Sequence, residues 1–221
     1  MRDVGIAMEL KPSALAVDPG HLGSMKVHLT NSGPEACDVA VQVPTRERDW
    51  SWVHPESCPV APGEEVVVAV FFKPACGPHP VAGSHTVDIV ARTAGDASTA
   101  QGQGTVDVSP FVDAAGALDP MVAYDPMATS YTFHLENRGN VAVTAALSTD
   151  DPSGALEVHV QPTSVCAEPG RTATATVTVR ARKKLRRGEH TYRVCVLARV
   201  EGGSDLRIEG AFRQQGLKPA K

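Results

Sequence analysis

The densest group of chemically active side chains is a basic run in the last quarter of the sequence. The run extends from Arg180 to Arg187, and six of its eight residues are cations, namely Arg180, Arg182, Lys183, Lys184, Arg186 and Arg187. That many charges cannot be buried without partners, so the run must form a solvated loop or strand end. Such a patch could dock an acidic protein, a phosphate group or an anionic lipid head group. The alternative is a hairpin tip whose charges serve solubility, because charge runs are usually solvated faces.

Two tryptophans, Trp50 and Trp52, are the other candidate partner-binding residues, and they lie within and just after the polar stretch Thr45 to Ser51. The period of two along a strand predicts that both lie on the same face. One could close the end of a folded domain while the other stays free to anchor a partner. The alternative for both is core packing, because a tryptophan is ordinarily mostly buried. We expect core packing more for Trp52 than for Trp50.

Metal binding and catalysis have little support from residue spacing. The chain has eight histidines and five cysteines, but no CxxC pair and no closely spaced set of three or four ligands. Cys76-Gly77-Pro78-His79 is the nearest approach, and Asp150 to Gly154 lacks the alternating acidic frame of a calcium loop. No GxSxG, HExxH, Walker loop or GxGxxG leading into a helix occurs. The sequence therefore predicts no catalytic residue, no metal, no cofactor and no enzyme.

A long internal repeat indicates which elements must position these residues. Met25 to Gly33 returns about a hundred residues later as Tyr131 to Gly139, and the two share His-Leu-x-Asn-x-Gly in one alternating frame. Pro62-Gly63 recurs as Pro169-Gly170, and Gly83-Ser84-His85-Thr86 recurs as Gly188-Glu189-His190-Thr191. Solenoid units repeat every ~20 to 50 residues, so this longer repeat is a domain. We predict two domains, residues 1–109 and 110–221.

Each half is predicted to consist of short strands joined by turns. Val4 to Leu10 and Ala14 to Val17 indicate a first strand broken at Lys11-Pro12. Met25, Val27 and Leu29 alternate with polar residues, which predicts a strand with one buried face. About seven such strands in each half favour an all-β class with two antiparallel β-sandwiches in series.

Two strands differ in the character of their second face. Glu65 to Phe72 has apolar residues at both its odd and its even positions, so both faces of this strand are apolar. Such a strand is covered on both faces, or its outward face meets a neighbour. Thr172 to Val179 instead alternates threonine with alanine and valine, which predicts an amphipathic strand. Outward-facing Val67, Ala69 and Phe71, together with this threonine-rich strand, are where we expect edge pairing or face packing.

Composition and charge set the remaining limits. The net charge of −4 gives no general case for binding nucleic acid, although residues 1–110 hold 7 Lys+Arg against 13 Asp+Glu and residues 111–221 hold 14 against 12. The start of the sequence lacks the basic and apolar regions of a secretion signal, and no segment reaches the ~18 apolar residues of a membrane span. The odd number of cysteines suits a reducing compartment. We therefore expect a cytoplasmic protein.

Several short motifs resemble a prokaryotic immunoglobulin-like module. They are Val17-Asp18-Pro19-Gly20, Asn31-Ser32-Gly33, Trp52-Val53-His54-Pro55, Pro62-Gly63-Glu64, Phe72-Lys73-Pro74 and Ala82-Gly83-Ser84-His85. Such modules are grouped with the alpha-galactosidase-associated, cell-adhesion-related and hydin-type domains. The whole chain resembles a tandem actinobacterial family whose members are labelled "hydrolytic protein", some of them encoded beside phage-tail-like contractile injection particles.

The resemblance implies two immunoglobulin-like sandwiches and a structural role. Many relatives continue into a membrane span, whereas this sequence stops at Lys221, so membrane tethering is not expected to carry over. The antibody-type disulfide between the sheets is also absent, because neither Met25 to Thr30 nor Thr86 to Arg92 contains a cysteine. The word "hydrolytic" has no matching catalytic motif here.

The leading hypothesis is a non-catalytic structural or adaptor protein that contacts other proteins, as an accessory component of an assembly such as a contractile injection particle. Peripheral contact of the basic run with an anionic surface stays open. A carbohydrate or cell-envelope binding module is the alternative, since related sandwiches accompany glycosidases. It calls for an exposed aromatic platform, although aromatic residues make up only 5% of the chain. A hydrolase is the third and weakest hypothesis.

Overall fold

The computed structural model describes residues 5–44, 49–94, 98–151 and 153–216. Part of the expected first strand (Val4), part of the polar stretch before Trp50 (residues 45–48) and Pro152 lie outside these residues. The chain divides into two compact units, Met1–Phe111 and Val112–Lys221, called unit 1 and unit 2 below. The boundary expected from the sequence lies slightly earlier, after Ser109.

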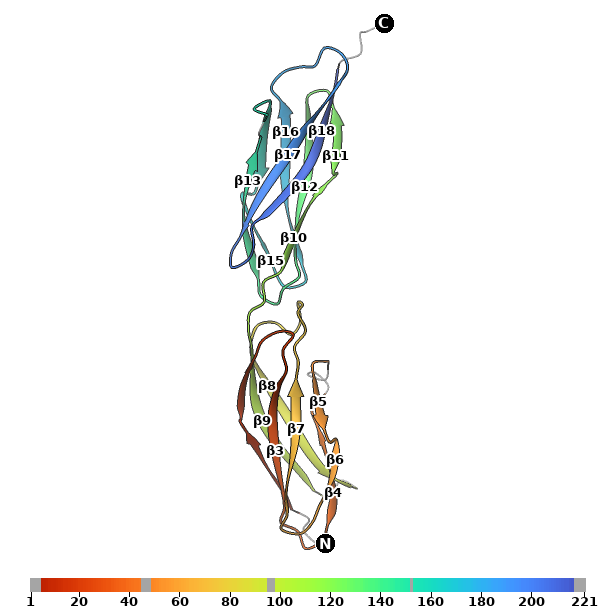
Figure 1. The fold of residues 1–221 in the computed structure, drawn as a ribbon, viewed down its shortest axis with the longest axis vertical. Helices are drawn as coiled ribbons and strands as arrows, with labels where there is room; N and C mark the ends of the chain where they lie inside the picture. Colours follow the sequence, from red (N-terminus) through yellow and green to blue (C-terminus); the bar gives the residue numbers. More distant parts are fainter. Residues whose placement is uncertain (1–4, 45–48, 95–97, 152, 217–221) are drawn as a thin grey trace. The chain divides into compact units, whose positions relative to one another are not determined.

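Unit 1 is a sandwich of two sheets (Figure 1). Its strands are β1 (Ile6–Lys11), β2 (Ala14–Val17), β3 (Gly23–Asn31), β4 (Cys37–Gln42), β5 (Ser51–His54), β6 (Ser57–Val60), β7 (Glu65–Phe72), β8 (Gly83–Thr93) and β9 (Thr99–Val108). A four-stranded sheet has the order β1-β3-β7-β5 and a five-stranded sheet has the order β2-β9-β8-β4-β6. Neighbours are antiparallel except β2 and β9, which are parallel.

Unit 2 repeats this topology strand for strand. Its strands are β10 (Ala114–Asp119), β11 (Val122–Asp125), β12 (Ala128–Asn137), β13 (Val143–Asp150), β14 (Leu156–Gln161), β15 (Ser164–Ala167), β16 (Thr172–Ala181), β17 (Glu189–Val200) and β18 (Leu206–Gln215). The orders are β10-β12-β16-β14 and β11-β18-β17-β13-β15. In the immunoglobulin arrangement, a four-stranded antiparallel sheet faces a sheet that contains the last two strands of the domain, and both units have this arrangement. The predicted fold class, two tandem immunoglobulin-like β-sandwiches, is confirmed.

Each unit has more strand segments than the sequence suggested, because two of its strands change sheet partway. In unit 1, β1 and β5 belong to the four-stranded sheet, and the segments that continue them, β2 and β6, belong to the five-stranded sheet. In unit 2, β10 and β14 are continued in the same way by β11 and β15. A proline stands at every change, namely at Lys11-Pro12, His54-Pro55, Asp119-Pro120 and Gln161-Pro162. Proline has no N–H to donate to a ladder, so pairing with the first sheet ends there.

The core of each unit lies between its sheets and consists of the inward rows of the strands. In unit 1, Met25, Val27 and Leu29 of β3 are fully buried, as their alternation predicts. In unit 2, Phe133 and Leu135 of β12 are buried in the same way. Burial of one such side chain contributes about 1.5–3 kcal/mol. The two cores are separate clusters, so each unit has apolar packing of its own.

The repeated asparagine is a buried tie between strands. Asn31 is 0% exposed; its Nδ2 donates to the carbonyls of Glu35 at 2.8 Å and Val60 at 3.0 Å, and its Oδ1 accepts from Gly33 N–H at 2.8 Å. Asn137 is equally buried and makes the same three bonds, at 2.8, 2.8 and 2.9 Å, to Val141, Ala167 and Gly139. An amide can satisfy two carbonyls and one N–H at once, which explains why the repeat shares this residue.

Candidate partner-binding surfaces

The two tryptophans lie on opposite sides of the four-stranded sheet of unit 1, so the prediction that they share a face is wrong. Trp50 is 8% exposed and packs against the buried ring of Phe72, with ring centroids 5.7 Å apart. Trp52 is 46% exposed and stacks on Phe71, with centroids 5.5 Å apart and the rings inclined by 21°. Strand β5 begins only at Ser51, and alternation of faces does not extend to a residue before the strand. The expectation that Trp52 is the better core residue is therefore reversed.

Trp52 belongs to an apolar group on the outside of unit 1, which we call the unit 1 outer face. It consists of Trp52 on β5 with Val67, Ala69 and Phe71 on β7, and Trp52 pairs with Phe71 in the ladder. Val67 is 45% exposed. Lys26 lies opposite Ala69 on β3, so a cation borders the group. Near Val67, His28 Nδ1 and Glu65 Oε1 are 2.5 Å apart, and this hydrogen bond lowers the pKa of Glu65.

Unit 2 has polar residues at the matching positions. His28 pairs with Val67 in unit 1, and the repeated histidine, His134, pairs with Thr174 in unit 2. Continuing along these strands, Ala69 matches Thr176 and Phe71 matches Thr178, while His159 pairs with Thr178 where Trp52 pairs with Phe71. These three threonines are exposed. Because unit 2 forms the same sheet with threonines, the sandwich itself does not require an apolar outer face.

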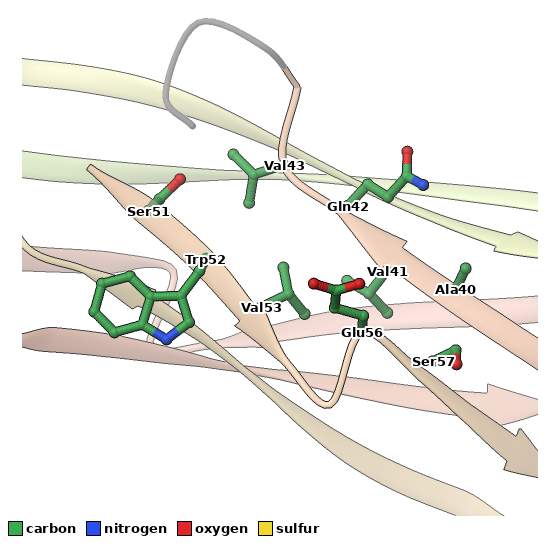
Figure 2. Close-up of a pocket in the computed structure, with 9 residues that line it drawn as sticks. All are labelled: Ala40, Val41, Gln42, Val43, Ser51, Trp52, Val53, Glu56 and Ser57. Carbon is green, nitrogen blue, oxygen red and sulfur yellow. The ribbon is translucent and has the colours of Figure 1, made fainter. Parts of the chain in front are cut away.

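A cleft of about 600 Å³ lies beside Trp52, where β5 and β4 diverge into different sheets (Figure 2). Figure 2 shows Ser51 and Val53 projecting toward Val41 and Val43, whereas Trp52 projects from the other side of β5. Glu56 lies at the turn that closes one end of the cleft. The cleft is therefore lined by valines and by the polar side chains of Gln42, Ser51 and Ser57, with one carboxylate at its end, and Trp52 borders it without filling it.

A second hollow of about 690 Å³ lies next to Trp50 and includes His79, Ser84 and His85. These side chains do not form a nucleophile, base and acid series. The Ser84 hydroxyl is hydrogen-bonded to the carboxylate of Asp107, and the His85 ring is hydrogen-bonded through Nε2 to the carbonyl of Val81 at 2.8 Å. The serine therefore contacts the carboxylate directly, and the His85 ring is bound to Val81 instead of standing between Ser84 and Asp107 as the histidine of a catalytic triad does.

The basic run forms the end of β16 and the loop that follows it, which we call the basic loop (residues 180–188). Its cations Arg180, Lys183, Lys184, Arg186 and Arg187 are exposed, while Leu185 is only partly exposed. Arg182 is the member with a defined acidic neighbour, since its Nη1 lies 4.0 Å from Glu157 Oε1. Its Nε donates to the carbonyl of Leu156 at 3.0 Å. The expectation of a solvated loop agrees with this placement.

Sequence reasoning missed the residue that holds the basic loop in place. Gln214 on β18 is 0% exposed, and its Nε2 donates to the carbonyls of Lys183 and Pro126, each at 2.9 Å. Its Oε1 accepts from the Tyr192 hydroxyl at 3.2 Å. The alternation along β18 could have revealed it, because Gln214 occupies an inward position in the same row as Ile208 and Phe212. A polar side chain in an otherwise apolar row is an informative exception.

The acidic turn that was considered for calcium uses its carboxylate locally. Asp151 accepts from the N–H groups of Ser153 at 3.0 Å and Leu156 at 2.7 Å. Burial alone raises the pKa of Asp151, but the hydrogen bonds from Ser153 and Leu156 outweigh burial and lower it. Among the described residues, no group of three or more histidine, cysteine or acidic side chains could hold a metal ion. No helix in the described part of the chain has the length and apolar character needed to cross a membrane.

No protein-family model matches the chain, and no curated protein matches it. Among solved structures, the D00-D0 domain of intimin is similar at 12% identity and a TM-score of 0.43, covering 94% of this chain and 98% of that one. The E. coli chaperone DraB has 12% identity and a TM-score of 0.35, covering 93% and 96%. The Yersinia pseudotuberculosis adhesin InvE has 13% identity and a TM-score of 0.36, covering 94% and 58%. The strand order, rather than these likenesses, carries the fold assignment.

Proposed function

We propose that this chain is a non-catalytic structural or adaptor protein that binds another protein through the unit 1 outer face. The observation that carries the proposal is the contrast between equivalent strands: Val67, Ala69 and Phe71 face outward in unit 1 where unit 2 has threonines. Exposing apolar side chains that the fold does not need has a cost in solubility, so a covering partner is the physical reason to keep them.

The chemistry of the outer face describes the partner it fits. Trp52 and Phe71 supply a large apolar area that loses little conformational entropy on binding, which is typical of interface anchors. Lys26 pairs with Ala69 in the ladder, Lys73 follows Phe72 in the sequence, and both lysines are exposed and have no ion-pair partner among the described residues. We expect a partner surface with apolar side chains at its centre and carboxylates at its rim.

A pull-down from native lysate with matched variants tests this proposal. The double variant Trp52→His, Phe71→Thr gives unit 1 the residues of unit 2 and is expected to lose a stoichiometric partner that the unchanged protein retains. The control His159→Ala, Thr178→Ala alters the matching positions of unit 2 and should retain it. Equal recovery by the two double variants, or no stoichiometric partner for the unchanged protein, would contradict the proposal.

The finer assignment follows from the resemblance of the motifs. It makes the partner a subunit of a larger assembly, such as a phage-tail-like contractile injection particle, in an actinobacterial cytoplasm. Two immunoglobulin-like units in series, each with its own core, suit an accessory component of this kind. Co-purification of the tagged chain with sedimenting particles, lost in the Trp52→His, Phe71→Thr variant, is the expected result.

A carbohydrate-binding module is the second candidate, and the exposure of Trp52 favours it. Sugar rings stack on exposed aromatic faces, and Trp52 over Phe71 supplies one. Binding on a glycan array that is lost in Trp52→Ala and kept in Trp50→Phe would support this candidate over a protein partner. A hydrolase remains the third candidate, and esterase and peptidase assays on the purified protein test it.

A further inference from the structure

The basic loop of unit 2 is held in a fixed shape by bonds that leave most of its charges unused. Gln214 fixes the carbonyl of Lys183, Arg182 N–H donates to the carbonyl of Ala155 at 2.9 Å, and Gly216 N–H donates to the carbonyl of Gly188 at 2.8 Å. These anchors use backbone groups of the loop. Apart from Arg182, whose guanidinium contacts Leu156 and Glu157, the cationic side chains of the loop are exposed while the backbone that carries them is restrained.

Unit 1 shows that the sandwich does not need this anchor. His85 pairs with Val106 in unit 1, and the repeated histidine, His190, pairs with Gln214 in unit 2. Valine is thus sufficient at this inward position for the same fold. Burying an amide is favourable only when its hydrogen bonds are made, so Gln214 is best explained by the loop that it restrains. A run that served solubility alone would need no restraint.

A further cation, Arg213, lies near the end of the loop, because its guanidinium is close to Glu189, the residue that follows Gly188. Arg213 precedes Gln214 on β18, and its guanidinium lies 5.4 Å from the centre of the exposed Tyr124 ring. Arg213 Nη1 is 3.6 Å from Glu189 Oε1, but its buried Nε has no acceptor among the described residues. The basic loop therefore adjoins an arginine and a tyrosine, two residue types that dominate interface energetics.

We propose that the basic loop, with Arg213 and Tyr124, binds an acidic, extended segment of another protein. Four of the six cations in the run are arginines, whose planar fork pairs with carboxylates through two hydrogen bonds. The cations are distributed along the loop, which matches several carboxylates in sequence better than one ion. Leu185 is not exposed enough to insert into a membrane, and the loop has no aromatic residue on which a base could stack.

Fluorescence anisotropy of a labelled glutamate-rich peptide, measured on the full chain, tests this assignment. Arg186→Gln, Arg187→Gln is expected to weaken binding by about tenfold or more, because two charge-assisted contacts are lost. The matched control Arg171→Gln, Arg199→Gln removes the same charge from exposed positions outside the loop and should change binding by less than about twofold.

A third variant separates a restrained loop from a flexible one. Gln214→Met keeps the net charge and nearly the side-chain length but removes the bonds to Lys183 and Pro126, and it should weaken peptide binding by about fivefold. The unfolding curve of this variant shows whether unit 2 is still folded. If unit 2 is not folded, the comparison of Arg186→Gln, Arg187→Gln with Arg171→Gln, Arg199→Gln decides whether the basic loop binds the peptide.

The proposal is overturned by equal losses in the two arginine double variants, by no detectable peptide binding, or by tighter binding to phosphatidylserine vesicles than to the peptide. It is also overturned if a folded Gln214→Met variant binds like the unchanged protein. The surface is separate from the unit 1 outer face, so failure here leaves the proposed function standing, and the Trp52→His, Phe71→Thr variant should bind the peptide normally.

Discussion

The two units have the same strand order, yet their four-stranded sheets present different outer surfaces. In unit 1 the outward row of β7 is Val67, Ala69 and Phe71, and in unit 2 the outward row of β16 is threonine. Inward positions of both strands are apolar, and all of them are buried except Val66 and Ala173 near the strand starts, which are partly buried. The comparison separates residues that the fold requires from residues that it merely permits, and only the second kind can report a function specific to one unit.

The largest expected effect distinguishes the two tryptophans. Trp50→Ala should lower the free energy of unfolding of unit 1 by about 3–5 kcal/mol, because a buried ring packed on Phe72 is lost. Trp52→Ala removes a half-exposed ring and should cost less than about 1.5 kcal/mol. Urea unfolding followed by circular dichroism measures both. Similar losses for the two variants would show that Trp52 is part of the core.

A second effect should be equal in the two units. Asn31→Ala and Asn137→Ala each leave two carbonyls and one N–H without the amide, so each should destabilise its own unit by about 2–4 kcal/mol. Unfolding curves of the two variants should shift by similar amounts. A large shift for only one of them would mean that the repeated asparagines are not equivalent.

Exchange of the outer faces should have a small effect on stability. Val67→Thr, Phe71→Thr gives unit 1 the residues of unit 2, and we expect a change of less than about 1 kcal/mol in the free energy of unfolding, since β-propensity differences span about 1 kcal/mol. The reciprocal Thr174→Val, Thr178→Phe should also stay folded. A severe loss in the first variant would show that the apolar face supports the sandwich rather than a partner.

The smallest effect concerns acid pH and occurs in unit 1. The His28 hydrogen bond lowers the pKa of Glu65 from its ordinary value of 4.5, so the bond stabilises the folded state above that pH. Its contribution is lost as the pH falls through the lower folded pKa. Unit 2 has Thr172 at the position that matches Glu65. Glu65→Thr should therefore reduce the dependence of unit 1 stability on pH below 4.5. Thermal unfolding over a pH series measures this, with Glu64→Thr as the neighbouring control.

Sequence reasoning succeeded where a strand is long and one face is buried. Met25, Val27 and Leu29 alternate with polar residues, and their burial follows because successive side chains of a strand point to opposite faces. The interruption at Lys11-Pro12 was also visible, since proline cannot continue a ladder. The equivalent interruption at His54-Pro55 was not recognised, because β5 and β6 are too short to show a period.

Positions of functional side chains were harder to predict than strands. The face of Trp50 depends on how the chain enters β5, and no local pattern records that path. Gln214 gains its meaning from Lys183 and Pro126, which are 31 and 88 residues away in sequence. Hydrogen-bond partners this distant are brought together only by the packed sheets.

The sequence by itself determined that this protein is two copies of one sandwich, because periodicity, turn residues and a repeated asparagine are local or repeated signals. Tertiary structure decided which of the two tryptophans lies outside the core and which polar group is buried to hold the basic loop. The physical reason is that burial is a property of the assembled sheets: Trp50 and Trp52 are two positions apart in one short segment, and only the packing of the two sheets makes Trp50 a core residue and leaves Trp52 half exposed.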